Sequence, residues 1–235
     1  MLKNWKEDLN AIADPEKIKI SAYFFKTNSG EYAEHDQFIG ISVPKNREVV
    51  KKYFQKIEFT DIKEMLKSNI HEYRFSAVLA LVERYKKEKN EQKRQEIVDF
   101  YLKNAEYVNS WDLVDTSAPH ILGVHLLKFP NPELLNVLSK TKNLWKNRMA
   151  IVATQTLIKQ GLFADTLRLA EYFLTHEHDL IHKATGWMLR EIGEKSEETL
   201  IHFLDHFATK MPRTALRYAI EKLKPELRKF YLGKK

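Results

Sequence analysis

The chain has 235 residues, no cysteine, and 39 basic against 32 acidic residues, so its formal net charge is +7. The absence of cysteine excludes disulfides, a thiol nucleophile, iron–sulfur clusters and cysteine-bound zinc, and any metal would need histidines and carboxylates. The modest positive charge favours an anionic partner without naming it, and because the longest apolar run, residues 77–82, is far shorter than the roughly 20 residues of a membrane span, we expect a soluble, cytoplasmic protein.

The N-terminal third of the chain combines helical segments with one long connection. Only seven glycines and seven prolines are present, which favours a nearly all-helical chain and gives little support for strands. Pro15 and Pro44 suit the first turns of two helices. Between them, residues 27–36 form a polar segment that ends at Asp36 and is predicted to be a long surface loop. Residues 71–88 then carry apolar side chains at helical spacing.

The remaining two thirds contain further amphipathic helices. Apolar side chains recur at helical spacing in residues 144–160 and 197–210. Pro132 and Pro212 are placed as at the start of a helix, and Gly161 fits a helix end. We therefore expect brief connections between helices throughout this part of the chain.

Charged residues at corresponding helix positions indicate a degenerate repeat. Successive members of the series are 38, 36, 35 and 30 residues apart: Arg74, Asp112, Arg148, Lys183 and Arg213. A period of roughly 35 to 40 residues is the size of a two-helix unit that buries its apolar face on the next unit. The predicted fold class is therefore all-α, an α-α superhelix (solenoid) of antiparallel helix pairs that forms a single domain over residues 1–235. One helix of each pair would line the inner surface and present these positions in register.

The most informative local feature is the run N-S-W-D-L-V-D, in which Trp111 and Asp115 stand four residues apart on one face of a predicted helix. Arg148 and Trp187 occupy the same register downstream. Two indoles, a carboxylate and an arginine suit a cationic substrate carried on a polyanion, because aromatic faces attract cations and a guanidinium binds phosphate. The competing interpretations are that the tryptophans are core residues, that Asp115 caps a helix or pairs with a base, and that Arg148 is an ordinary surface arginine.

The histidines indicate neither a metal site nor a catalytic triad. His176 and His178 are two residues apart, a spacing that would direct their rings to different faces of a helix, so we expect a solvated turn between helices. His120 and His125 show no triad spacing with a serine. There is no glycine-rich phosphate loop. We therefore expect no metal and no cofactor.

The segments W-D-L-V-D, N-R-M-A and G-W-M-L-R-E, together with residues 38–44 followed by Arg47, resemble the AlkD-type DNA alkylation repair glycosylases, a family built from HEAT-like repeats. The resemblance spans nearly the whole chain. It implies a monofunctional, metal-independent DNA-alkylpurine N-glycosylase of base excision repair, which we expect to be a monomer. The implied substrates are positively charged alkylated purines in double-stranded DNA, chiefly 7-methylguanine and 3-methyladenine.

The resemblance also implies roles for the four candidate residues. Asp115 matches the catalytic aspartate, and Arg148 matches an arginine that supports the site and the DNA backbone. Trp111 and Trp187 match the aromatic pair that contacts the lesion nucleotide. A base alkylated on a ring nitrogen is already cationic and leaves without a general acid, so one carboxylate can stabilise the sugar cation and orient or deprotonate the water. Glycosylases generally flip the target nucleotide, whereas this family is understood to leave it stacked, and the sequence leaves both modes open.

Five basic residues are predicted to bind DNA: Arg47, Arg74, Lys183, Arg190 and Arg213. Two alternatives compete with the enzyme. A non-catalytic relative that binds branched or distorted DNA would lack the Trp-plus-Asp pair, which this chain has. A helical-repeat scaffold for protein partners would have an apolar or mixed inner groove instead of a basic one.

Overall fold

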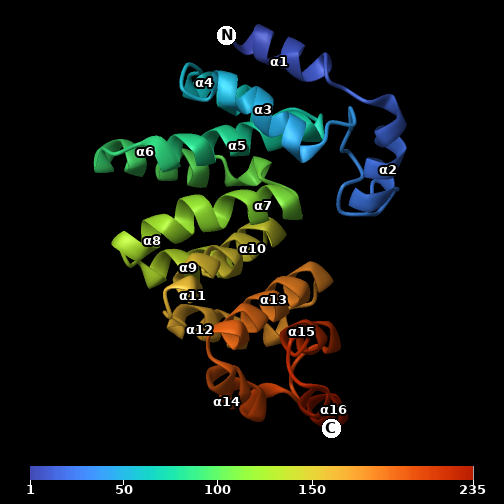
Figure 1. Cartoon of the computed structure of the whole chain (residues 1–235), viewed down its shortest axis with the longest axis vertical. Coiled ribbons are helices and arrows are strands. Elements are labelled where there is room, and N and C mark those ends of the chain that lie inside the picture. The colour runs from blue at the N-terminus through green and yellow to red at the C-terminus, as the bar shows by residue number, and fades with distance from the viewer. Residues whose placement is uncertain (235) are drawn as a thin grey trace. The chain divides into compact units, whose positions relative to one another are not determined.

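The computed structural model describes residues 1–234, and helices make up most of it (Figure 1). Over these residues, β-type pairing is confined to an isolated parallel bridge between Gln37 and Ile70. The prediction of an all-α chain is therefore confirmed. None of the described helices combines the length and the apolar character that crossing a membrane requires.

The chain divides into two compact units, Met1–Ser117 and Ala118–Lys235, which we call unit 1 and unit 2. In a repeat protein each helix pair packs on its neighbours, so compact groups of pairs are expected within one chain. The prediction of a single domain over residues 1–235 stays a prediction.

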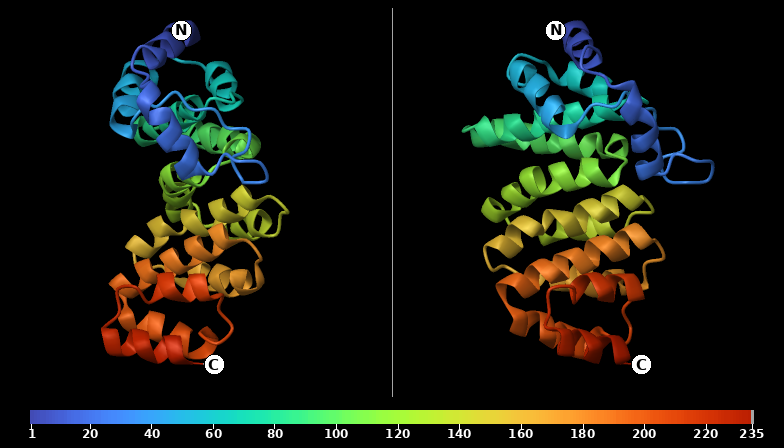
Figure 2. Two further views of the ribbon diagram at one scale, coloured as in Figure 1. Left: turned by 90° about the vertical axis from the view of Figure 1, so that its right-hand side faces the viewer. Right: turned by 45° about the vertical axis from the view of Figure 1, so that its right-hand side comes forward.

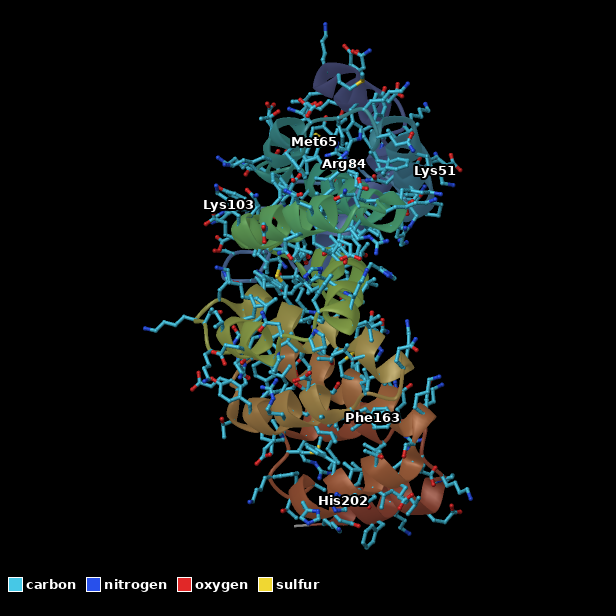
Figure 3. The ribbon with its side chains drawn as sticks, turned by 90° about the vertical axis from the view of Figure 1, so that its left-hand side faces the viewer. Lys51, Met65, Arg84, Lys103, Phe163 and His202 are labelled. Carbon is cyan, nitrogen blue, oxygen red and sulfur yellow. The ribbon has the colours of Figure 1, made fainter. Side chains whose placement is uncertain are left out.

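Unit 1 is organised around one buried helix, α5. Its residues 71–82 are all buried, and α3, α4 and α6 pack against it. Apolar side chains occur on several sides of α5, a pattern typical of a helix surrounded by others. In Figure 3, Met65 and Arg84 lie within unit 1, whereas the exposed Lys51 and Lys103 lie at its sides. The helices are α1 (Leu2–Asn10), α2 (Pro15–Phe25), α3 (Val43–Tyr53), α4 (Phe59–Leu66), α5 (His71–Lys87), α6 (Glu91–Lys103) and α7 (Trp111–Ala118), with a 3-10 turn at Ala105–Tyr107.

Unit 2 is organised around α13, which packs against α10, α12, α14 and, most extensively, α15. Gly186 permits the close approach of α13 and α15, because a Cβ at this position would collide with the carbonyl oxygen of Ala215. Unit 2 begins with a π-helical turn, Pro119–Gly123. Its helices are α8 (Val124–Lys128), α9 (Pro132–Ser139), α10 (Leu144–Ala153), α11 (Gln155–Lys159), α12 (Ala164–Tyr172), α13 (Asp179–Lys195), α14 (Glu197–Phe207), α15 (Arg213–Ala219) and α16 (Pro225–Gly233), with a 3-10 turn at Phe173–Thr175.

The predicted helix starts and stops are confirmed. Pro15, Pro44 and Pro132 lie in the first turns of α2, α3 and α9, and Pro212 directly precedes α15. Gly161 follows α11 with a φ of 77°, a left-handed conformation that suits glycine after a helix. The three amphipathic segments correspond to α5, to α10 with α11, and to α14. The five positions of the repeat register fall on α5, α7, α10, α13 and α15, one on each helix.

The connection between α2 and α3 has a projecting part and an anchored part. The projecting part, residues 27–35, extends from unit 1 beside α2 (Figure 2). The anchored part, residues 36–41, lies against the start of α5 and is called the anchor segment below. Gln37 donates its N–H to the carbonyl of Asn69 (2.9 Å), and its own carbonyl accepts the N–H of His71 (2.8 Å). The side chain of Asp36 is 10% exposed, so the prediction of a surface loop is wrong at this end.

Glu72 holds the rest of the anchor segment. Its buried carboxylate accepts the backbone N–H groups of Ile39, Gly40 and Ile41 at 2.8–3.2 Å. Gly40 has a φ of 79°, and a Cβ there would collide with the carbonyl oxygen of Asp14. The glycine in the run at residues 38–44 is therefore required by the packing of this segment.

Candidate functional site

Helix α7 presents the predicted Trp-plus-Asp pair from a fixed position in unit 1. Trp111 is its first residue, and Trp111 and Asp115 are both half-buried, as expected for one helix face at the edge of a core. The opposite face is held inside. The hydroxyl of Ser117 donates to the carbonyl of Leu113 (2.6 Å) and lies 2.7 Å from the hydroxyl of Tyr101 on α6.

The indole of Trp111 is one member of a group of stacked rings. It lies on Phe25 of α2, with centroids 5.4 Å apart and planes inclined by 15°, and it meets Phe24 edge-on at 5.6 Å. Phe25 in turn contacts Phe38 (5.1 Å) and His71 (4.5 Å). The indole therefore packs on α2, and the anchor segment and α5 hold Phe25 beneath it. The competing interpretation of a simple core tryptophan does not describe this half-buried ring.

Beneath these rings lies a buried charge network. His71 is placed between two carboxylates: its Nδ1 is 3.1 Å from Oδ2 of Asp36, and its Nε2 is 2.8 Å from Oδ2 of Asp112. Arg74 places Nη2 2.6 Å from the same oxygen of Asp36 and donates from Nη1 to the carbonyl of Ser68 (2.8 Å). The four ionisable side chains of this network are 3–14% exposed.

The network holds His71 in its charged form. Burial lowers the pKa of His71, but the negative charge of Asp112 and the hydrogen bonds to Asp112 and Asp36 outweigh burial and raise the pKa to about 9. For Asp36, burial opposes ionisation, yet the hydrogen bond from His71 and the charge of Arg74 hold its pKa below the usual value. Because both ring nitrogens face carboxylate oxygens, both must carry a proton to donate.

Asp115 lies close enough to the interior for its charge to reach a buried phenol. Burial raises the pKa of Tyr101, and the negative charge of Asp115 raises it further. Tyr101 is fully buried, whereas Asp115 is half-buried. A carboxylate at such a boundary acts electrostatically more strongly than one in bulk water, so it can stabilise a cation that approaches this face of α7.

Two of the predicted DNA-binding residues lie in unit 1, and the structure separates their roles. Arg47, on α3, is exposed, so a phosphate can reach its guanidinium. Arg74 is 3% exposed and its guanidinium is engaged by Asp36 and Ser68. The prediction that Arg74 binds DNA directly is therefore wrong, because a phosphate contact would require a buried guanidinium to leave its ion partner.

The second pair of predicted site residues lies in unit 2. Arg148, on α10, is 5% exposed and donates from Nη1 to the carbonyl of Leu180 (2.6 Å). This burial excludes an ordinary surface arginine and suits a supporting role more than a grip on a phosphate. Trp187, on α13, is half-buried and donates from Nε1 to Oε1 of Glu191 (2.9 Å).

The other basic residues predicted to bind DNA in unit 2 have local partners. Lys183 lies 2.8 Å from Oδ2 of Asp179, and Arg190 forms an ion pair with Glu221. Arg213 is exposed and donates to the carbonyl of Leu232 (3.0 Å). Lys183 and Arg190 stand at i−4 and i+3 from Trp187, so the three share a face of α13.

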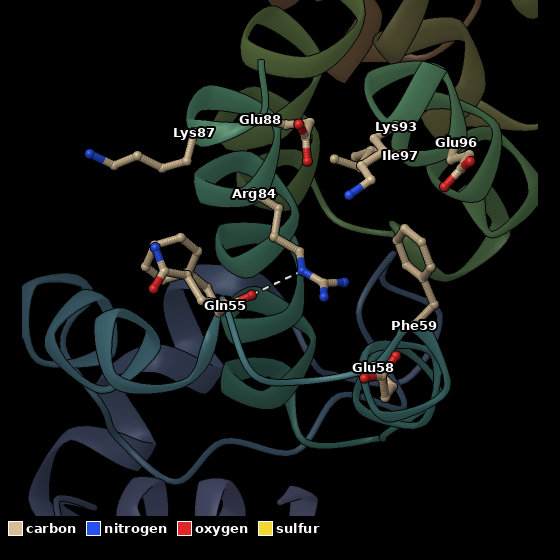
Figure 4. Close-up of a pocket in the computed structure, with 10 residues that line it drawn as sticks. Gln55, Glu58, Phe59, Arg84, Lys87, Glu88, Lys93, Glu96 and Ile97 are labelled. Atoms are coloured by element: carbon tan, nitrogen blue, oxygen red, sulfur yellow. Dashed lines mark hydrogen bonds between the residues drawn. The ribbon is translucent and has the colours of Figure 1, made fainter. Parts of the chain in front are cut away.

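A hollow of about 430 Å³ in unit 1 surrounds Arg84, near the opposite end of α5 from His71 (Figure 4). Arg84 donates to the carbonyls of Phe54 (2.9 Å) and Ile57 (2.6 Å) and lies over the ring of Phe59. Carbonyls at the end of a helix lack partners within that helix. The hollow thus surrounds an arginine that completes the end of α3, and it does not coincide with the predicted site.

The histidines His176 and His178 lie in the turn between Phe173–Thr175 and α13, as their spacing predicts. Nδ1 of His178 accepts the N–H of Leu180 (3.1 Å) and so caps α13. Within residues 1–234, no group of three histidines, aspartates or glutamates is arranged to hold a metal ion.

His71 is not among the residues predicted from the sequence, and Asp36 and Asp112 are predicted to have no joint role. The two carboxylates stand 35 and 41 residues from His71 along the chain. The only local signal is that His71 directly begins a helix that carries Arg74 one turn later.

Comparison with known proteins identifies one family. A family model described as "DNA alkylation repair enzyme" matches residues 5–223. No curated protein matches the chain. A solved structure described as a predicted DNA alkylation repair enzyme from Enterococcus faecalis is similar in fold, with a TM-score of 0.72, 17% sequence identity, and coverage of 91% of this chain and 97% of that one. At this identity the likeness concerns the fold, and it supports the predicted class of stacked helix pairs.

Proposed function

Because the chain belongs to the family of DNA alkylation repair enzymes, we propose that it hydrolyses the N-glycosidic bond of positively charged alkylated purines in duplex DNA. The proposed substrates include 7-methylguanine and 3-methyladenine. The observation that carries this proposal is the half-buried face of α7, where the stacked indole of Trp111 and the carboxylate of Asp115 stand one helical turn apart.

The chemistry requires little beyond these two groups. An alkylated purine cation needs no proton to leave, so the barrier lies in the positive charge that develops on the deoxyribose. Asp115 stabilises this charge and orients or deprotonates the attacking water, whose oxygen bonds to the sugar carbon as the neutral base leaves. The face of Trp111 attracts a cation by roughly 0.5–2 kcal/mol, which favours a charged lesion over a neutral base. No metal or cofactor takes part in this scheme.

Arg148 and Trp187 each have a proposed role, which follows from the contacts of the side chain. The buried guanidinium of Arg148 supplies a fixed positive charge, which favours ionised acids and anionic substrate groups in its surroundings. Trp187, held by Glu191, offers a second half-exposed aromatic surface to the lesion nucleotide.

Arg47, Lys183, Arg190 and Arg213 are proposed to contact the DNA backbone. Lys183 and Arg190 would exchange their partners Asp179 and Glu221 for phosphates. Exposed ion pairs contribute about 0–1 kcal/mol, so this exchange costs little. Substitution of any one of these side chains by alanine should lower the salt dependence of DNA binding by about one unit of slope, because one phosphate is no longer neutralised.

The test is release of 7-methylguanine from methylated duplex DNA under single-turnover conditions, with and without EDTA. We expect release in both conditions. Asp115→Asn should lower the rate by about 100-fold or more, as loss of a preorganised electrostatic group does, while fluorescence anisotropy shows equal or tighter DNA binding because a negative charge is removed. Asp99→Asn, at an exposed position of α6, is the matched control and should keep the wild-type rate.

Equal rates for wild type and Asp115→Asn would contradict the catalytic assignment. DNA binding without base release by the wild-type protein would instead support the non-catalytic alternative. Loss of release in EDTA would contradict the metal-independent scheme.

A further inference from the structure

His71 connects three elements of unit 1 that are distant in sequence. It is the first residue of α5, it bonds to Asp36 of the anchor segment, and it bonds to Asp112 in the first turn of α7. Asp112 directly follows Trp111 in the chain. A displacement of Asp112 therefore moves the residue that presents the indole.

The same imidazole also reaches Trp111 through a ring. His71 stacks on Phe38 (4.9 Å, 24°) on one side and contacts Phe25 (4.5 Å, 44°), and Phe25 carries the indole of Trp111 at 5.4 Å. A cationic ring is attracted to aromatic faces. The position of Trp111 is thus held twice by His71, once through the carboxylate of Asp112 and once through Phe25.

Stability alone does not explain this arrangement. Buried ion networks are frequently no more stable than apolar side chains of similar volume, because each charge loses its hydration. Here two atoms of the network also lack a partner: among the described residues, Oδ1 of Asp112 and Nε of Arg74 are buried without a hydrogen-bond partner. Incomplete satisfaction is costly in a region of low dielectric constant and points to a role beyond folding.

We propose that His71 is a positioning residue for the face of α7 that carries Trp111 and Asp115. As an imidazolium bonded to Asp36 and Asp112, His71 fixes the orientation of the Trp111 ring, and deprotonation of His71 allows this ring to reorient. This inference rests on the proposed function for its effect on catalysis, but the conformational link between His71 and Trp111 exists without it.

The charged groups around His71 decide the direction of the pH dependence. The anchor segment contributes Asp36, α7 contributes Asp112, and α5 contributes Arg74, whereas α2 contributes only the ring of Phe25. Two negative charges and one positive charge leave a net attraction for the imidazolium, which is why the pKa of His71 lies at about 9. Loss of this proton above pH 9 removes one hydrogen bond to a carboxylate and the charge that attracts both carboxylates.

The first experiment measures conformation in the free protein. The fluorescence of Trp111, obtained as the difference between wild type and Trp111→Phe, is followed from pH 7 to 10.5. We expect a step with a midpoint near 9 in the wild type and in His35→Gln, an exposed neighbouring histidine outside the network, and no step in His71→Gln. If the wild type shows no step, or His71→Gln retains it, the proposal is overturned.

The second experiment measures catalysis under single-turnover conditions. In His71→Gln, base release at pH 7 should fall by about tenfold or more, because a small misplacement of a positioning group carries such a cost, while binding to undamaged duplex changes less than twofold. The wild-type rate should decline as pH rises through 9, and the rate of His71→Gln should show no such decline. An unchanged rate with an unchanged pH profile overturns the link to catalysis.

Two further measurements separate misfolding of the variant, failure of the proposed function and failure of the positioning role. If His71→Gln does not fold by circular dichroism, Asp112→Asn and the titration of the His71 ring by NMR in the wild-type protein replace it; a ring that is already neutral at pH 7 overturns the proposal. If no variant releases any base, the proposed function fails, whereas the fluorescence titration still decides whether His71 positions Trp111.

Discussion

The anchor segment depends on one buried carboxylate, and substitution of Glu72 by glutamine tests this dependence. Oε1 of Glu72 accepts N–H groups from Ile39, Gly40 and Ile41, and Oε2 accepts from Ile39 as well. A glutamine oxygen in the place of Oε1 could still accept from all three N–H groups, but an NH₂ group in the place of Oε2 cannot accept the second bond from Ile39.

The magnitude follows from these bonds. A hydrogen bond to a charged group contributes about 1.5–3 kcal/mol and a neutral one about 0.5–1.5 kcal/mol. The weakening of three bonds by about 1 kcal/mol each and the loss of the second acceptor of Ile39 amount to about 3–4 kcal/mol, which falls to about 3 kcal/mol because the neutral amide is easier to bury than the carboxylate. At about 2–4 °C per kcal/mol for a chain of this size, Glu72→Gln should lower Tm by roughly 6–12 °C.

Thermal unfolding followed by circular dichroism measures the effect. Glu48→Gln is the matched control, since Glu48 is exposed on the neighbouring helix α3 and should change stability by no more than about 0.5 kcal/mol. A Tm for Glu72→Gln within about 2 °C of the control, less than the shift of a single kcal/mol, would show that the carboxylate does not hold the anchor segment as described.

Three further outcomes are expected. Because the pKa of His71 is raised from 6.5 to about 9, the stabilisation that protonated His71 provides is fully present below pH 6.5 and is lost as pH rises through 9. The free energy of unfolding, measured in urea, should therefore fall by on the order of 3 kcal/mol by pH 10. An equal fall in His71→Gln would refute the assignment. The lowered pKa of Asp36 acts at the acid end, so its stabilisation is lost as pH falls below its ordinary value near 4, and Asp36→Asn should flatten the urea profile there. Gly186→Ala should destabilise unit 2 by about 1–3 kcal/mol, because its Cβ meets the carbonyl of Ala215, whereas Gly233→Ala, which has open space around it, should unfold at the wild-type temperature.

The correct predictions from sequence concern interactions between residues that are close together in the chain. Helical periodicity identified α5, α10 and α14, because side chains three and four residues apart share a face whatever surrounds the helix. The placement of Trp111 and Asp115 on one face of α7 has the same origin. Proline and glycine marked helix ends because their backbone restrictions act within a few residues.

The errors concern residues whose setting depends on distant segments. Arg74 is predicted to line the inner surface and bind DNA, and Asp36 to end a surface loop, yet the two form a buried ion pair 38 residues apart. Neither helical spacing nor local composition indicates which segment will meet the start of α5. The predicted fold class succeeded while the role of Arg74 failed, because the first depends on a repeated local pattern and the second on a single tertiary contact.

Sequence alone determined that this protein is a chain of amphipathic helices, with an indole and a carboxylate one turn apart on one of them, since both features follow from the pitch of an α-helix. Tertiary structure decided which ionisable groups are buried together: it placed Asp36 and Asp112 on the two nitrogens of His71 and removed Arg74 from the surface. The physical reason is that the charge state of a side chain is set by the dielectric and the partners around it, and these are supplied by segments that meet only when the chain has folded.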